Sequence, residues 1–129
     1  MTLTSNNDIL LSVFNSSDIK LLTKSGEIKP FFSVSPLLTG GIHVTSDNYI
    51  IVGVTEPGDD FTPTDKSTRA LLIFGMDGKQ QHTYQYDSNK HRLFTLPRRI
   101  TTNNNKDIVV VDSTSGRTGR VVVVGGRGV

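Results

Sequence analysis

The chain has 129 residues, 35% of them hydrophobic and 20% charged, which is typical of one globular domain rather than of a disordered or membrane protein. It has no cysteine, which excludes disulfides, thiol catalysis and zinc sites with thiolate ligands. It also has neither an apolar stretch long enough to span a membrane nor a secretory signal, so we expect a cytoplasmic protein without membrane contact. The net charge is only +2, but residues 88–129 carry +6 and residues 1–87 carry −4, so the last third is the basic part.

Short apolar runs dominate the chain, rich in Ile, Val, Phe and Tyr and bounded by turn-forming residues, and no window has a sustained helical period. This pattern predicts an all-β protein. Three runs superimpose in chain order: NDILLS (7–12), NYIIVG (48–53) and KDIVVV (106–111). A second element follows each of them: IKLLTKSG (19–26), LLIFGMDG (71–78) and VVVVGGRG (121–128). The closing glycines lie 52 and 50 residues apart, which indicates an ordered internal repeat.

A third element precedes the first one twice, as LTGGIHVT and LPRRITTN, with Ile42 and Ile100 in register. The middle unit is therefore complete and predicts four strands, at about 40–45, 49–54, 69–74 and 80–86. Four antiparallel strands at this period are the signature of a β-propeller blade. We expect one partial propeller domain over 1–129, of about two and a half blades: three strands in 7–34, a complete blade in 38–86 and three strands in 96–129. A β-sandwich is the alternative fold.

Neighbouring strands of an antiparallel sheet run in opposite directions, so successive connections lie alternately at its two ends. Tight turns at one end are expected at 45–48, 75–79, 102–106 and 125–128. The longer segments 53–68, 87–97 and 112–120 then gather at the other end, which we call the long-loop face. Longer loops on a rigid scaffold are where binding usually occurs, so the long-loop face is the expected binding surface.

The pattern P-x-x-I-T-x-N-x-N-x-D-I-V-V-V-D, from Pro97 to Asp112, is followed by a hydrophobic strand that closes on glycine. It resembles an NHL-type blade of a six-bladed propeller, and in particular the C-terminal propellers of tripartite-motif (TRIM) proteins. The segment from Leu71 to Ile100 is similar to the joint between blades in that family. In such blades an Asp after the second strand is tied to an Arg that starts the third. The resemblance implies this tie for Asp112 and Arg120, with Arg117 as the alternative partner.

This resemblance implies a recognition module, because TRIM propellers bind target proteins or structured RNA. Ubiquitin transfer in that family belongs to a separate zinc-bearing RING domain, and a chain without cysteine has no RING. We therefore expect no enzyme activity and no cofactor. The favoured function is binding of protein targets, as the substrate-binding part of a TRIM-type ubiquitin ligase, and RNA binding is the alternative.

Six basic residues fall on or beside the long-loop face and are the candidate binding residues, because Arg and Lys bind phosphates and acidic peptides. RNA would bind the basic loops 90–98 and 117–120. A solubilising rim is the competing interpretation. Arg99 is expected to point to the central channel instead. The candidates are Lys90, His91, Arg92, Arg98, Arg117 and Arg120.

A metal-dependent lactonase or lyase-like propeller is the third hypothesis. Such sites gather carboxylates, Asn or His from several blades, but His43, His82 and His91 occupy unrelated positions of the repeat. The acidic loop 56–66 lacks the ordered spacing of a calcium loop. We expect no metal site, a structural role for His43, and packing of Tyr84 and Tyr86 against the next blade.

The valine runs near the end of the chain do not alternate with polar residues, so both faces of their sheet should be covered. One cover is the middle blade. A closed ring needs at least about four blades of roughly 45 residues each, more than this chain supplies. We therefore expect an exposed apolar face and an open edge, and either self-association or further blades.

Overall fold

The computed structural model describes residues 2–4, 7–13, 16–58, 64, 67–115 and 118–125. Within these ranges the regular structure consists of strands alone, which confirms the all-β class. The strands are β1 (Thr2–Leu3), β2 (Ile9–Ser12), β3 (Asp18–Leu22), β4 (Ile28–Ser33), β5 (Leu38–Val44), β6 (Tyr49–Thr55), β7 (Arg69–Gly75), β8 (Gln80–Tyr84), β9 (Pro97–Thr102), β10 (Ile108–Ser113) and β11 (Gly119–Val124).

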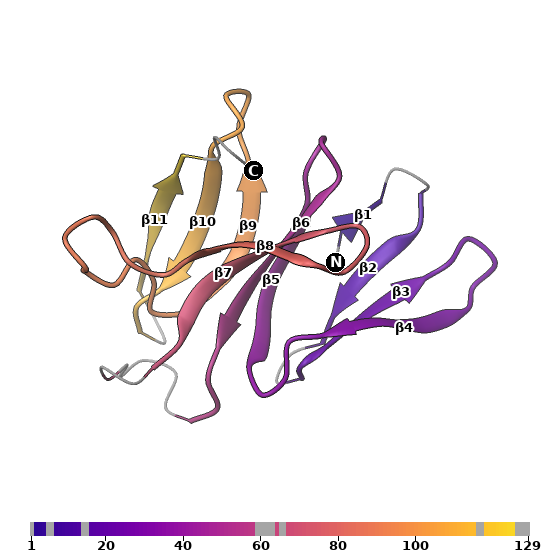
Figure 1. The fold of residues 1–129 in the computed structure, drawn as a ribbon, viewed down its shortest axis with the longest axis horizontal. Coiled ribbons are helices and arrows are strands. Elements are labelled where there is room, and N and C mark those ends of the chain that lie inside the picture. Colours follow the sequence, from indigo (N-terminus) through magenta and orange to yellow (C-terminus); the bar gives the residue numbers. More distant parts are fainter. Residues whose placement is uncertain are drawn as a thin grey trace.

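The strands form three antiparallel sheets that resemble propeller blades. The first sheet has the order β1-β2-β3-β4, the middle sheet β5-β6-β7-β8, and the last sheet β9-β10-β11. They stand side by side, with the middle sheet between the other two (Figure 1). Strand β5 contacts β1 and β2 on one side and β9 on the other, so the first strands of the three sheets are neighbours. A sandwich has two facing sheets, and the described residues form three.

Strand pairing shows that the sequence repeat is also a structural repeat. The first and second elements pair in the same register in every sheet: Ile9 with Leu22, Ile50 with Phe74, and Ile108 with Val124. The next residues also correspond: Leu10 with Leu21, Ile51 with Ile73, and Val109 with Val123. Each residue of a unit therefore has a structural equivalent in the other two units.

Two hydrophobic cores lie on the two faces of the middle sheet. Successive strand residues point to opposite faces. Ile50 and Val52 accordingly pack with Leu10 and Ile19 of the first sheet, and Ile51 packs in the other core. That second core joins the middle and last sheets through residues that include Leu71, Ile73, Ile100, Ile108 and Val110. Burial on both faces explains why β6 and β7 are continuously apolar.

Two differences between the predicted and the observed strands have a clear structural reason. The structure adds β1, which pairs with β2 ahead of the predicted range 7–34. Strand β8 ends at Tyr84 instead of residue 86, because the chain turns there and Tyr86 forms an isolated bridge with Arg92. Asp87 stabilises this turn by accepting hydrogen bonds from the backbone N–H groups of Asn89 and His91.

The outer face of the last sheet is exposed at Val111, Val121 and Val123. The third strand, β11, pairs with β10 and is the end strand of its sheet. An exposed apolar face and an open edge were both expected from the valine runs. Over the residues that the structure describes, no helix is long and apolar enough to cross a membrane.

Candidate functional site

Contacts between the sheets support the predicted sorting of the connections. At the tight-turn end, Lys106 Nζ lies 3.0 Å from Asp47 Oδ2, which joins the turns of two neighbouring sheets. At the long-loop face, Arg92 donates hydrogen bonds to the carbonyl oxygens of Thr64 and Ser67. Thr64 and Ser67, from the segment 53–68, therefore contact the segment 87–97.

The joint between the middle and last sheets is held by Asp112 and Arg120. Asp112 is buried, and its carboxylate accepts hydrogen bonds from the backbone N–H groups of Thr95 and Leu96 at 2.8–3.0 Å. Arg120 Nε lies 3.0 Å from Asp112 Oδ2, and its Nη2 donates to the carbonyl of Leu93 at 2.9 Å. The structure thus contains the Asp112–Arg120 tie. The alternative partner, Arg117, lies outside the described residues.

A second ion pair, between Glu56 and Arg69, holds the same joint from the middle sheet. Arg69 is fully buried, and its Nε and Nη2 donate to the Glu56 carboxylate at 2.8–3.1 Å. Its Nη1 donates to the carbonyl of Thr95 at 2.6 Å. Burial would raise the pKa of the Glu56 carboxyl, but hydrogen bonds from Arg69, the backbone and Ser67, together with the Arg69 charge, lower it to about 2.

The Glu56–Arg69 pair was missed in the sequence because the repeat alignment places Val54 opposite Asp112. In the structure the acid lies two residues after Val54, and Arg69 precedes Ala70, the residue that pairs with Val54. The middle sheet therefore has the same kind of tie at a shifted position. An arginine that opens the apolar run RALLIF is the available sequence signal.

The five candidate binding residues that the structure describes, all except Arg117, do not come together in one cluster. The Arg92 guanidinium, besides its two carbonyl contacts, lies 5.7 Å from the centre of the Tyr86 ring. Arg92 and Arg120 are thus both engaged within the chain. Lys90 and His91 are exposed on the turn after β8, where Lys90 has a φ of 62° and His91 Nδ1 lies 3.7 Å from Asp87 Oδ2.

Arg98 lies elsewhere, on β9, beside a cavity of about 300 Å³ between β9 and β5. Arg98 and the adjacent Arg99 are both exposed, and neither side chain makes a hydrogen bond or an ion pair with another of the described residues. Across the cavity, Ser12 Oγ donates to the carbonyl of Gly40 at 3.1 Å. We call this the Arg98–Arg99 cavity; it is lined by Ser12, Gly40, Gly41, Ile42, Arg98, Arg99 and Ile100.

Two glycines allow β9 to approach β5 so closely at this cavity. A Cβ atom on Gly40 would lie 2.4 Å from the carbonyl oxygen of Pro97, and one on Gly41 would lie 2.5 Å from that of Arg98. Real Cβ atoms do not approach backbone oxygens so closely, so a larger residue would push the strands apart. The Gly-Gly pair therefore positions the two arginines against the first and middle sheets.

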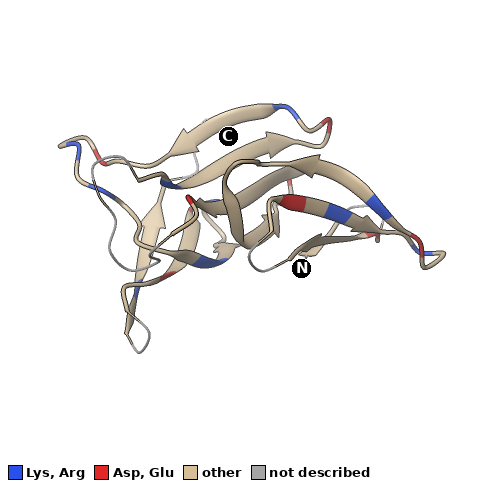
Figure 2. Ribbon diagram, turned by 90° about the horizontal axis from the view of Figure 1, so that it is seen from below, with Lys and Arg blue, Asp and Glu red and all other residues tan. Residues whose placement is uncertain are grey.

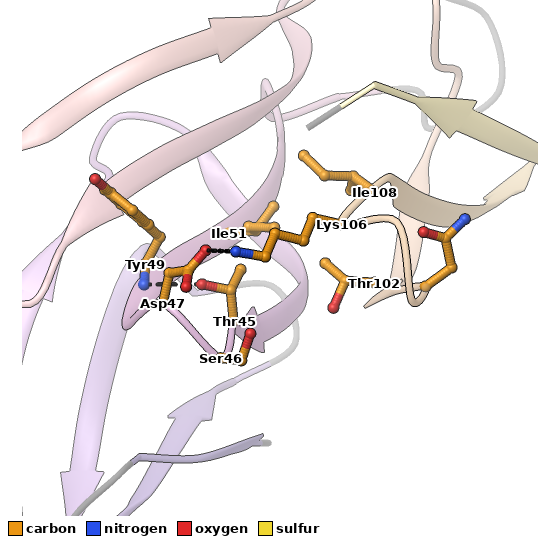
Figure 3. A pocket seen from close by; sticks show the side chains of 9 residues that line it. Thr45, Ser46, Asp47, Tyr49, Ile51, Thr102, Lys106 and Ile108 are labelled. Carbon is orange, nitrogen blue, oxygen red and sulfur yellow. Dashed lines mark hydrogen bonds and ion pairs between the residues drawn. The ribbon is translucent and has the colours of Figure 1, made fainter. Parts of the chain in front are cut away.

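A smaller cavity lies at the tight-turn end, between the middle and last sheets. Figure 3 shows the Asp47 carboxylate and the Lys106 ammonium group in contact, with Thr102 and Ile108 on the side of the last sheet. Its volume is about 50 Å³. Ligand pockets usually measure about 300–1,000 Å³, so this cavity is too small for an organic ligand.

The remaining titratable and aromatic candidates have ordinary structural contacts. His43 Nε2 lies 3.2 Å from Thr102 Oγ1, and burial lowers the pKa of its imidazole. Tyr84 packs against the second core, as expected, whereas Tyr86 is exposed under Arg92. Among the described residues there is no cluster of three His, Asp or Glu side chains. Asp59, Asp60, Phe61 and Asp65 of the acidic loop lie outside the described residues.

Among the described residues, the Lys and Arg positions are distributed over several separate parts of the ribbon (Figure 2). At the Arg98–Arg99 cavity, two adjacent arginine side chains that have no partner among the described residues border a hollow of ligand size.

Comparison with known proteins gives a fold but no family. No family model and no curated protein matches the chain. A solved structure of a protein of unknown function from Bacteroides caccae is similar, with a TM-score of 0.53 and 14% sequence identity. The match covers 95% of this chain and 44% of that chain, so this chain spans less than half the length of its structural neighbour.

Proposed function

We propose that this chain is a non-catalytic recognition module that binds an acidic segment of a protein target at the Arg98–Arg99 cavity. The observation that carries the proposal is the pair of exposed arginines that line a hollow of about 300 Å³. Guanidinium groups bind carboxylates in a bidentate geometry, which suits the side chains of an acidic segment.

Protein is favoured over RNA by the distribution of charge. A protein that follows a nucleic-acid backbone needs a groove or stripe of cations, because each phosphate is neutralised separately. Here Arg92 and Arg120 are engaged with backbone carbonyls and Asp112, and the other cations are dispersed. Two exposed arginines that line one hollow suit a short acidic motif better than a strand of phosphates.

The resemblance to TRIM propellers supports the same class of function. In this proposal the chain acts in the cytoplasm as the substrate-binding part of a ubiquitin ligase, and a separate RING domain supplies the catalysis. The binding surface then combines the Arg98–Arg99 cavity with the neighbouring long loops, where Lys90 and His91 are exposed.

Charge reversal at the cavity tests this proposal. The double variant Arg98→Glu/Arg99→Glu should lose the proteins that the wild-type chain captures in a cell extract after crosslinking, as identified by mass spectrometry. The control Lys29→Glu/Lys79→Glu changes the net charge equally, at exposed sites on the first and middle sheets, and should capture the same proteins as the wild type.

Nuclease treatment of the extract separates the two ligand classes. Capture that survives the nuclease and disappears in the Arg98→Glu/Arg99→Glu variant supports protein binding. Capture that disappears with the nuclease supports the RNA alternative. If the arginine variant captures the same proteins as the control, binding at this cavity is excluded.

A further inference from the structure

Both outer sheets carry an apolar face with no neighbouring sheet among the described residues. On the first sheet, Leu3, Ile9, Leu22 and Ile28 pair across all four strands, and Leu3 and Ile28 are 60% and 61% exposed. On the last sheet, Val109 and Val111 of β10 pair with Val123 and Val121 of β11. Val121 and Val123 are 65% and 59% exposed. We call these the first face and the last face.

The last face corresponds in the repeat to a surface that is buried in both of the other sheets. Val109 and Val123 correspond in the repeat to Leu10 and Leu21 of the first sheet. That pair packs in the core shared with the middle sheet, which is the next sheet along the chain. The corresponding residues of the middle sheet, Ile51 and Ile73, likewise pack in the core shared with the last sheet. The last face is thus built to meet a following sheet.

The first face is equivalent to the opposite half of the same interface. Ile9 and Leu22 correspond to Ile50 and Phe74, which pack in the core shared with the preceding sheet. In the last sheet the corresponding pair is Ile108 and Val124, and it also packs toward the preceding sheet. The first face is therefore built to meet a preceding sheet, so the two free faces are the two partners of one type of interface.

We propose that two copies of this chain bind head to tail, the last face of each copy against the first face of the other, and close a ring of six sheets. A heterologous contact of this kind forms a closed ring when its rotation closes, and a filament when it does not. Propeller rings contain about four to eight sheets. Each copy has three sheets, so a ring of two copies has a number of sheets inside that range, whereas a ring of one copy or of three copies does not.

The free faces lie at opposite ends of the row of sheets, as this arrangement requires (Figure 1). The neighbouring strands β1, β5 and β9 would then surround the centre of the ring. Both Arg98–Arg99 cavities would border that centre, one from each copy. The pairing rests on the two apolar faces and does not depend on which ligand the arginines bind.

The mass of the chain in solution is the first test. Light scattering after size-exclusion chromatography should give about 28 kDa, twice the 14.1 kDa of one chain. A species of 14 kDa at micromolar concentration would show that no second copy binds. A series of larger assemblies would overturn the closed ring and indicate an open filament.

Two face variants test the head-to-tail pairing. Val121→Glu/Val123→Glu changes the last face and Leu3→Lys/Ile28→Lys changes the first face, so each variant alone should have a mass of about 14 kDa. Mixing them leaves one native contact and places Glu opposite Lys in the other, so the mass should return to about 28 kDa. The control Gln80→Glu/Gln81→Glu, on the exposed strand β8, should keep the mass of the wild type. If one face variant stays dimeric, like faces pair with each other and the proposal fails.

Crosslinking gives a readout that does not depend on disrupting the fold. The chain has no cysteine, so Val123→Cys and Ile28→Cys each introduce a single thiol. Both positions lie on the outer strands of their sheets. A flexible bis-maleimide should join the two variants when they are mixed, and should join neither variant to itself. Self-crosslinking of Val123→Cys, or no crosslinking in the mixture, would overturn the proposed pairing.

Discussion

Arg69 is the largest fully buried side chain among the described residues, and its charge is balanced by the Glu56 carboxylate. It donates to the Glu56 carboxylate and to the carbonyl of Thr95, so it ties the loop after β6 to the joint between the middle and last sheets. A buried cation costs a large desolvation energy unless such partners are in place. The chain therefore depends on these contacts to align the two sheets.

Replacing this arginine should lower stability strongly. Arg69→Met keeps much of the apolar volume but leaves Glu56 without its cation and Thr95 without its donor. We expect a loss of about 3 kcal/mol in the free energy of unfolding, measured by urea denaturation at a fixed protein concentration. The control Lys29→Met removes an exposed lysine that lies 3.8 Å from Glu27, and should change stability by less than about 0.5 kcal/mol. Equal effects of the two substitutions would contradict the role of Arg69.

Glu56 should make the fold sensitive to acid. Its pKa is about 2 in the folded chain and about 4.5 ordinarily, so the unfolded chain takes up a proton first as the pH falls. The stabilisation by Glu56 is therefore complete above pH 4.5 and is lost between pH 4.5 and about 2. This linkage contributes roughly 1–3 kcal/mol. Urea midpoints measured from pH 7 to 3 should show the decline.

The Glu56→Gln variant separates this group from the other carboxylates. It should be less stable than the wild type at pH 7 and should lose less stability on acidification. Glu27→Gln, at an exposed carboxylate, is the matched control and should follow the wild-type curve. A Glu56→Gln curve parallel to that of the wild type would show that other groups cause the acid sensitivity.

At the scale of elements, the contact between β5 and β9 depends on the absence of side chains at two positions. Gly41→Ala would place a Cβ atom 2.5 Å from the carbonyl oxygen of Arg98. This oxygen is part of the backbone, so it cannot move aside as the end of a flexible side chain can. The strands must separate, which we expect to cost about 1–3 kcal/mol in thermal or urea unfolding. Gly125→Ala is the control, because nothing lies within 4 Å of its Cβ position. If Gly41→Ala leaves the free energy of unfolding unchanged, the strands can move apart without loss of stability.

The strands and their order were predictable because each repeat carries its own local pattern. The equivalence of Ile42 with Ile100 was read from sequence, and both pair with equivalent residues, Val52 and Val110. Strand β1 was missed because two residues are too short to form a pattern, and it exists through its pairing with β2. Intrinsic propensity determines whether a long apolar run forms a strand, whereas tertiary contacts determine whether such a short segment does.

The roles of the individual arginines were harder to predict, because their partners are backbone carbonyls. Arg92 binds Thr64 and Ser67, and Arg120 binds Leu93 in addition to Asp112. Carbonyl groups occur at every residue, so a sequence does not mark the ones that an arginine will reach. Arg98 lies on β9, directly after the long segment 87–97, and its cavity depends on Gly40 and Gly41 of another sheet. Only the fold brings these segments together.

At the scale of the whole molecule, the three sheets form a row with two unlike ends. Every internal face of the row is buried, whereas the two terminal faces leave large apolar side chains exposed. Burying such surface is the main favourable term in protein association. If a second copy provides the cover, folding and association are coupled, and part of the measured stability belongs to the contact between copies.

This coupling predicts a melting temperature that rises with protein concentration. Unfolding of the ring releases two chains, so a hundredfold increase in concentration adds about 2.7 kcal/mol per dimer by mass action. For an assembly of this size that corresponds to a rise of about 5–10 °C, measurable by circular dichroism in cells of different path length. The Val121→Glu/Val123→Glu variant should melt at the same temperature at every concentration, because its chains unfold singly. A wild-type melting temperature that does not change with concentration would mean that each chain's own three sheets supply all of its stability.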